Sequence, residues 1–320
     1  MELYPLQFEP IFKERIWGGS KLKSLLNKSI PSNHTGESWE ISSVENDVSI
    51  VANGFLKGKS LNDIVQEFPV ELLGTKVFSL FGKQFPLLFK FLDAQEDLSI
   101  QLHPNDALAK KYHNSFGKTE MWYVMQADQD SRLIIGFKED SSSEDYLTNL
   151  KNKTLLDILE IKNATQGDVY FLETGTIHAI GAGTVIAEIQ QTSDITYRVY
   201  DFDRTDAQGN LRELHLDLAL QAINYKKQET QKTYSKVENT ANEVVQCEFF
   251  TTNFIPLQGE ILVAMNNSSF KVYMCVEGSF SLIVDEVSTH YKKGDTILIP
   301  ACLPDFHLKG IASILEIYIS

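Results

Sequence analysis

Two histidines, a glutamine and a glutamate in this sequence could together hold a metal ion. In the segment LSIQLHP apolar and polar residues alternate, so an extended chain points Gln101 and His103 to the same side. Glu120 opens the segment EMWYVMQA, and His178 lies in GTIHAIG. An amide oxygen, two imidazoles and one carboxylate are a plausible ligand set for zinc and leave room for water or a substrate. Because a single histidine at the end of a strand is more often a hydrogen-bonded structural residue, spacing alone leaves this site a hypothesis.

Short strands are expected to position these residues. Much of the chain consists of β-branched or aromatic segments bounded by turn residues, which is typical of a β protein. Strands are expected at 98–103, 120–127, 132–137, 167–173, 184–191 and 195–202. Helical or turn segments are expected as insertions at 60–73, 104–112, 144–159 and 211–223. The sequence therefore predicts a mainly β fold with helical insertions.

Composition and charge exclude several classes of function. The chain has 320 residues, 43% of them hydrophobic, so it can bury a sizeable core. A net charge of −14 and the lack of a long basic run disfavour nucleic-acid binding. No apolar stretch approaches the roughly 20 residues that span a bilayer, and the amino terminus lacks the pattern of a secretory signal. Three scattered cysteines indicate neither a disulfide framework nor a thiolate metal site, so we expect a cytoplasmic protein.

A polar segment and a degenerate repeat divide the chain. Residues 226–243 show little apolar periodicity, so we predict a metal-binding domain at 1–235 and a second domain at 246–320. The second contains GDTILIPACLPDFHL, which is similar to GDVYFLETGTIHAIG in the first, as expected if two similar β-barrels were joined. His307 takes the place of His178 in this repeat, but no other ligand segment accompanies it. The second domain is therefore expected to hold no metal.

Six segments in the first 205 residues together resemble a known family, the type I mannose-6-phosphate isomerases in their short bacterial form. They are GESWEIS, PLLFKFLDA, LSIQLHPND, GKTEMWYV, GTIHAIG and ITYRVYDFDR. The resemblance implies a cupin-type jelly-roll β-barrel with helical insertions, followed by a smaller cupin-like barrel. It implies one zinc ion per chain, held by the residues at Gln101, His103, Glu120 and His178. The implied activity interconverts mannose 6-phosphate and fructose 6-phosphate through a cis-enediol.

Four further residues are candidates for contacts with the sugar. The resemblance places Lys118, Asp194 and Arg198 in catalytic roles, although Lys118 can also be read as a surface lysine. Asp194 and Arg198 can also be read as a salt bridge at the end of a strand. Lys90 lies between two phenylalanines, and a lysine in an apolar strand is costly unless it is paired or faces a cavity. We hold Lys90 as a substrate-binding candidate.

Two other functions are compatible with a metal-binding barrel. One is a non-catalytic sugar-binding or regulatory cupin, and the other is a cupin oxygenase that uses Fe(II), which accepts the same ligand types. The isomerase is preferred because neither alternative predicts the GKTE and YRVYDFDR segments. The expected partner is a hexose 6-phosphate, and the expected state is a monomer or a homodimer.

Overall fold

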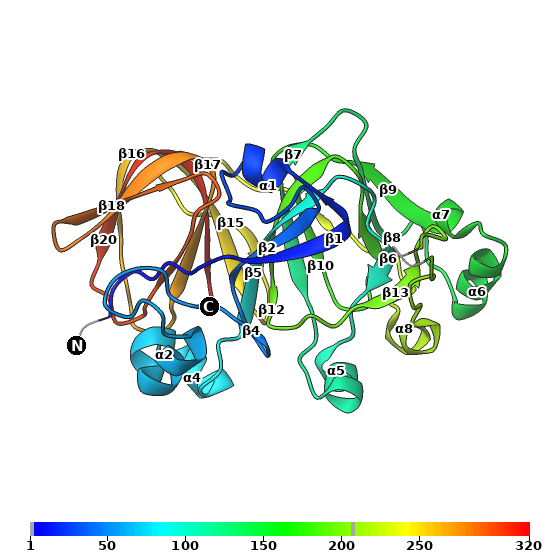
Figure 1. Ribbon diagram of the computed structural model, residues 1–320, viewed down its shortest axis with the longest axis horizontal. Helices are drawn as coiled ribbons and strands as arrows, with labels where there is room; N and C mark the ends of the chain where they lie inside the picture. Colours follow the sequence, from blue (N-terminus) through cyan, green and yellow to red (C-terminus); the bar gives the residue numbers. More distant parts are fainter. Residues whose placement is uncertain (1–2, 206–208) are drawn as a thin grey trace.

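The chain folds into three sheets that form successive layers, with short helices at their edges (Figure 1). The computed structural model describes residues 3–205 and 209–320. The central sheet has seven antiparallel strands in the order β1-β2-β5-β12-β7-β10-β14. Their bounds are β1 (Ile11–Gly19), β2 (Thr35–Ile41), β5 (Leu87–Ala94), β12 (Thr184–Gln191), β7 (Glu120–Ala127), β10 (Val169–Leu172) and β14 (Gln231–Lys232).

Two further sheets flank the central one. The second sheet consists of β13 (Tyr197–Tyr200), β6 (Ile100–Leu102), β11 (His178–Ile180), β8 (Arg132–Phe137) and β9 (Leu159–Asn163), in that order. The third consists of β15 (Asn242–Gln246), β16 (Thr251–Val263), β20 (Phe306–Tyr318), β17 (Lys271–Val284) and β18 (Val287–Lys292), with β19 (Thr296–Ile299) paired to β17. The short strands β3 (Ser43–Val44) and β4 (Asp47–Val48) pair with each other as a two-stranded antiparallel sheet.

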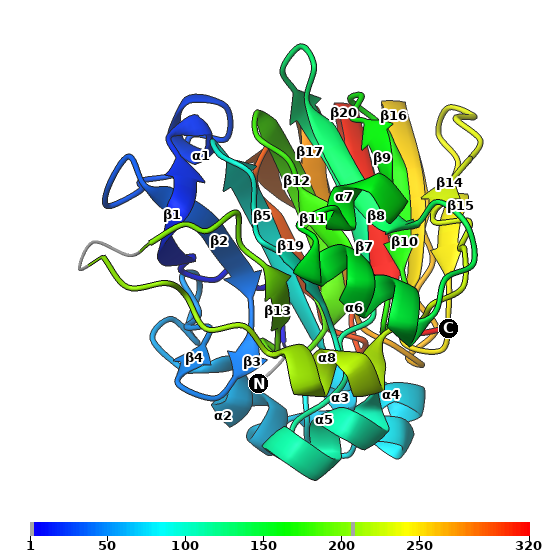
Figure 2. The ribbon, with the colours of Figure 1, turned by 90° about the vertical axis from the view of Figure 1, so that its right-hand side faces the viewer.

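The helices are short and lie outside the sheets, as Figure 2 shows. They are α1 (Lys21–Ser24), α2 (Leu61–Glu67), α3 (Pro69–Leu73), α4 (Thr75–Phe81), α5 (Asp106–His113), α6 (Ser143–Lys151), α7 (Leu155–Ile158) and α8 (Leu216–Ala222). The helix expected at 60–73 starts with a capping box between Ser60 and Asp63 but breaks at Phe68. Pro69 explains the break, because it has no N–H to continue the first helix and suits the first position of the next.

The central sheet is buried on both faces, and this arrangement determines where the site lies. On β7, Met121, Tyr123 and Met125 face an apolar core shared with the third sheet. The alternate residues Trp122 and Val124 face a second core shared with the second sheet. Because side chains alternate along a strand, Glu120 points to the same side as Trp122. The charged residues of this face are therefore enclosed between the central and second sheets.

The mainly β prediction is confirmed, and three expected strands have the observed bounds, namely β7, β8 and β12. Other segments are shorter than expected. The strand expected at 98–103 is limited to β6, and the helix expected at 211–223 is limited to α8, since Leu211 is 67% exposed and has no core to pack against. The segment 144–159 divides into α6 and α7, because Asn152 ends the first helix.

The polar segment at 226–243 connects the central sheet to the third. Its strand β14 pairs with β10, and β15 begins at Asn242 and pairs with β16. One apolar core contains residues from both ends of the chain, for example Leu6 and Leu315. The two domains at 1–235 and 246–320 stay a prediction.

Phe89 offers a test of the core between the central and third sheets. Its side chain is fully buried in that core. We expect Phe89→Ala to lower the free energy of unfolding by about 3–5 kcal/mol, because it removes a large apolar group and leaves a cavity. The control is Leu80→Ala at a position that is 59% exposed, where the change should stay within about 0.5 kcal/mol. Denaturant titration measures both, and equal effects would contradict this account of the core.

Candidate metal centre

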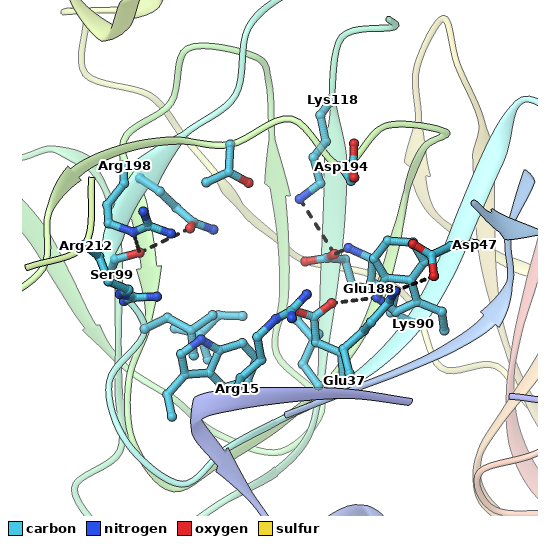
Figure 3. Close-up of a pocket in the computed structure, with 18 residues that line it drawn as sticks. Arg15, Glu37, Asp47, Lys90, Ser99, Lys118, Glu188, Asp194, Arg198 and Arg212 are labelled. Atoms are coloured by element: carbon cyan, nitrogen blue, oxygen red, sulfur yellow. Dashed lines mark hydrogen bonds and ion pairs between the residues drawn. The ribbon is translucent and has the colours of Figure 1, made fainter. Parts of the chain in front are cut away.

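A cavity of about 410 Å³ opens between the central and second sheets and is lined by charged side chains (Figure 3). Its walls come from β1, β2, β5 and β12 of one sheet and from β6 and β13 of the other. Four of the predicted site residues outside the ligand set line it, namely Lys90, Lys118, Asp194 and Arg198. Gln101 lines it as well. The structure therefore brings together residues that lie more than a hundred positions apart in the sequence.

His103, Glu120 and His178 meet beside this cavity as a buried cluster. Their potential ligand atoms all lie within 4.8 Å of one another. Nε2 of His103 lies 3.5 Å from Oε2 of Glu120, and Nε2 of His178 lies 3.5 Å from Oε1 of the same residue. Gln101 of β6 is paired in register with His178 of β11, so the amide and the imidazole are cross-strand neighbours. The four residues predicted as ligands thus lie at one place in the fold.

Hydrogen bonds at the outer nitrogen fix both imidazoles in the orientation a metal requires. Nδ1 of His103 lies 2.8 Å from the carbonyl oxygen of Ile195, and Nδ1 of His178 lies 2.8 Å from that of Thr176. A carbonyl can only accept, so each Nδ1 must donate and each neutral ring keeps its lone pair on Nε2. Burial also favours the neutral form, lowering the pKa of His178 to about 4 and that of His103 well below its usual value.

Two inward-facing atoms of this cluster lack a hydrogen-bond partner although they are buried. They are Oε1 of Glu120 and Nε2 of His178. Buried polar atoms in proteins are nearly always paired, so unpaired ones need an explanation. A lone pair on nitrogen and another on a carboxylate oxygen, 3.5 Å apart, are donors that a metal ion would satisfy. The cluster is therefore suited to hold a metal ion.

Lysines and carboxylates alternate beside the candidate ligands. Nζ of Lys118 donates to Oε2 of Glu120 at 2.6 Å and lies 3.7 Å from Oε1 of Glu188. Lys90 donates to the same Glu188 oxygen at 3.1 Å. Although burial opposes ionisation, the two lysines lower the pKa of Glu188 to about 2. For Glu120 burial prevails and raises the pKa to about 7. Lys118 is thus a buried residue beside the ligands and not a surface lysine.

Sequence reasoning missed Glu188, although a signal was present. Glu188 lies in the buried strand β12 between Ala187 and Ile189, and its register partners are Lys90 and Trp122. The argument that singled out Lys90, a charge within an apolar strand, applies equally to Glu188. The Trp122 indole also donates to this carboxylate, at 3.0 Å. A search for charges inside apolar strands would have found the pair.

Arginines gather at the second-sheet side of the cavity. Arg198 is paired in register with Gln101, donates to Oγ of Ser99 at 3.3 Å and donates to the carbonyl of Glu213 at 2.9 Å. Within residues 3–205 and 209–320, Arg198 and Asp194 form no ion pair, so the salt bridge considered from the sequence is not observed there. Arg212, which sequence reasoning also missed, lines the cavity and shares the carboxylate of Asp201 with Arg204.

His307, the histidine of the repeat, lies outside this site. Its side chain is 46% exposed, and Nδ1 lies 3.0 Å from Oε1 of Glu260. The two residues are on the paired strands β20 and β16. That the second barrel holds no metal stays a prediction. Among the described residues, no helix is long and apolar enough to cross a membrane. The cytoplasmic location and the monomeric or homodimeric state also stay predictions.

A buried His-Glu-His cluster between two β-sheets makes this a β protein with a candidate metal site, and comparison with known proteins identifies the family. The family model "Phosphomannose isomerase type I, catalytic domain" matches residues 5–133, and "Mannose-6-phosphate isomerase, cupin domain" matches residues 240–319. The chain is 37% identical over 316 residues to mannose-6-phosphate isomerase ManA of Bacillus subtilis, covering 98% of each chain. The chain belongs to the type I phosphomannose isomerase family.

Solved structures agree with this assignment. The crystal structure of the mannose 6-phosphate isomerase from Bacillus subtilis has a TM-score of 0.90 and 36% identity, covering 98% of this chain and 99% of that one. A putative mannosephosphate isomerase from Archaeoglobus fulgidus, at 23% identity and a TM-score of 0.78, shares the fold over 100% of this chain and 99% of that one. The predicted cupin fold and the predicted family are confirmed, and the protein is an isomerase.

The ligand set can be tested by measuring metal content. The loss of a residue that only supports a ligand typically lowers metal affinity by about 10- to 100-fold. We expect His103→Ala and His178→Ala, which remove direct ligands, to lower metal affinity by more than about 100-fold. Gln101→Ala should weaken binding less, because an amide oxygen is a poorer ligand than an imidazole. His307→Ala is the matched control and should keep its metal. Elemental analysis of the four purified variants is the measurement, and equal retention in all of them would contradict the assignment.

Proposed function

We propose that this protein interconverts mannose 6-phosphate and fructose 6-phosphate, with one zinc ion per chain held by Gln101, His103, Glu120 and His178. The observation that carries the proposal is the pair of buried, unpartnered ligand atoms of Glu120 and His178 beside a charged cavity in a chain of this family. Leaving such atoms unpaired costs about 1–3 kcal/mol each. A purely structural cluster has no reason to keep them.

The donor set supports zinc as the metal. Two imidazoles, one carboxylate and one amide oxygen are nitrogen and oxygen donors that zinc accepts, with a position left for the substrate. Zinc held by these residues would supply Lewis-acid chemistry for oxygen atoms of the sugar that gain negative charge during the reaction. The chain itself keeps the ligands ready. The carbonyls of Ile195 and Thr176 hold the two rings in the tautomer that binds a metal through Nε2.

The reaction moves one proton between C1 and C2 and another between the two oxygens. Lys118 is positioned for the oxygens, because its ammonium is held beside the ligands by Glu120 and Glu188. Asp194 lines the same cavity and, in the part of the chain that the structure describes, forms no ion pair, so its carboxylate is available to take the proton from carbon. Arg198 stabilises negative charge on the enediolate oxygens, because a guanidinium stays charged and offers a planar fork of donors.

The arginine cluster, defined as Arg198, Arg204, Arg212 and the carboxylate of Asp201, supports a phosphorylated substrate. Arg204 and Arg212 share the carboxylate of Asp201, and within residues 3–205 and 209–320 Arg198 forms no ion pair, which leaves positive charge at this side of the cavity. Burial and the neighbouring Arg212 lower the pKa of Arg198, as expected where like charges are held together. An anion relieves this repulsion. We assign the phosphate of a hexose 6-phosphate to Arg212 at this cluster.

A coupled assay for fructose 6-phosphate formation tests the function and the metal together. Protein freed of metal by a chelator should lose activity, and about one equivalent of zinc per chain should restore it, which is the capacity of one four-ligand site. The full rate in protein shown by elemental analysis to be metal-free would refute the metal's role. Absence of turnover in folded, zinc-loaded protein would refute the isomerase, and oxygen uptake with Fe(II) would favour the oxygenase instead.

Arg198 and Arg212 should respond differently to substitution. Arg198→Ala should lower kcat by about 10²- to 10³-fold while zinc and fold are retained, because it removes a donor to charge that develops in the transition state. Arg198→Lys should recover only part of the lost kcat, since lysine keeps the positive charge but lacks the planar pair of guanidinium donors. Arg212→Ala should mainly raise KM, because phosphate binding is the same in ground and transition states. Steady-state kinetics with zinc content and melting temperature distinguish them. A rise in KM alone for Arg198→Ala would reassign it to the phosphate.

A further inference from the structure

The wall of the cavity formed by β1, β2 and β5 carries charges that no step above uses. Arg15 of β1 donates through Nε to Oε1 of Glu37 at 2.6 Å. The other oxygen of Glu37 accepts the indole N–H of Trp39 at 2.6 Å, so both carboxylate oxygens are held. Glu37 is 8% exposed, whereas the side chain of Arg15 keeps 36% of its surface exposed and lines the cavity. Figure 3 shows Glu37 beside Arg15, on the other side of the cavity from Arg198.

The amino groups of Arg15 remain available for a ligand. Nη1 donates to the carbonyl oxygen of the adjacent Glu14, at 3.2 Å, and Nη2 has no hydrogen-bond acceptor among residues 3–205 and 209–320. A guanidinium anchored through Nε presents its outer edge as a rigid pair of donors. Because Glu37 is fixed by Trp39, that edge is held in place before any ligand arrives.

The charge balance of this wall differs from that of the arginine cluster. Every cation here is in an ion pair: Lys13 pairs with Asp47, Arg15 with Glu37, and Lys90 with Glu188. Lys118 also contacts Glu188 but has Glu120 as its nearer partner. The charges of the wall are therefore balanced, while in the arginine cluster Arg204 and Arg212 share one carboxylate and Arg198 forms no ion pair among the described residues. A phosphate dianion is favoured at the cluster. A wall with balanced charges and with the Nη1 and Nη2 groups of Arg15 facing a ligand is suited to uncharged hydroxyl groups.

We infer that Arg15 is a specificity-determining residue that binds the hydroxyls at C3 and C4 of the sugar, with Glu37 as its positioning residue. The inference rests on the proposed function. With C1 and C2 at the metal ligands and the phosphate on the arginine cluster, the C3 and C4 hydroxyls are left to face the neutral wall. Both are free in the ring and open-chain forms of the sugar. Trp17, which also lines the cavity, gives this wall an apolar surface for the C–H groups of the sugar.

Substrate analogues test the inference directly. Arg15→Ala should lower kcat/KM for mannose 6-phosphate by about 10- to 100-fold, the value of a hydrogen bond to a charged donor. The same substitution should have less than about a threefold effect on at least one of the 3-deoxy and 4-deoxy analogues, because the contacted hydroxyl is already missing. Arg15→Lys should recover part of the loss. Lys23→Ala, an exposed cation outside the cavity, is the charge-matched control and should behave as wild type.

Inorganic phosphate separates this role from a phosphate contact. Its inhibition constant should be unchanged in Arg15→Ala and raised in Arg212→Ala. Equal losses of kcat/KM on mannose 6-phosphate and both deoxy analogues would overturn the inference, as would a raised inhibition constant in Arg15→Ala. If Arg15→Ala fails to fold, as judged by its melting temperature, Arg15→Lys serves for the same comparison. Absence of turnover in wild type overturns the proposed function and the inference together, whereas turnover that is insensitive to Arg15 overturns the inference alone.

Discussion

The chain of buried charges formed by Glu120, Lys118, Glu188 and Lys90 is the interaction on which the rest of the site depends. An isolated charge in a protein interior costs several kcal/mol, and that cost is offset only when each charge has a close partner. Here each carboxylate contacts a lysine and each lysine a carboxylate, at distances from 2.6 to 3.7 Å. Removing Lys118 leaves Glu120 buried without a lysine, and removing Glu188 leaves Lys90 without a carboxylate, so these two inner members hold the set together.

This constraint accounts for the construction of the central sheet. One face of β5, β7 and β12 is apolar and packs against the third sheet, and the other carries Lys90, Glu120 and Glu188. Antiparallel register places those three on neighbouring strands, since Lys90 and Glu188 are directly opposite one another. The third sheet and the helices supply the apolar burial that stabilises the fold. The second sheet covers the charged face and contributes Gln101 and His178, and His103 directly follows its strand β6.

The two sides of the cavity differ in the balance of their charges. On one side the ion pairs are complete, and on the other the arginines exceed their carboxylate. A phosphorylated sugar has the same division, with a doubly charged group at one end and neutral hydroxyls along its chain. In the function proposed above, this asymmetry would orient the sugar before it contacts the candidate ligands, because the anion is favoured at only one side.

Local sequence patterns determined the strands and part of the site. Alternation in LSIQLHP predicted a shared side for Gln101 and His103, and the bounds of β7 and β12 were predicted because their apolar character and flanking residues are local properties. The motifs of the family located all four ligand candidates. These features depend on residues close in the chain, which is why the sequence is sufficient for them.

The tertiary structure decided what depends on distant pairing. Glu188 becomes a site residue only through its register with Lys90, and Arg15 only because β1 pairs with β2 beside Glu37. Arg212 lines the cavity and is held there by its ion pair with Asp201. The segment that contains Arg212 shows no strand pattern in its sequence. The orientation of the imidazoles depends on carbonyls of two separate loops, at Ile195 and Thr176. Periodicity predicts which face of a strand a side chain occupies, but strand register and loop closure decide what that side chain meets, and neither is encoded in the local pattern.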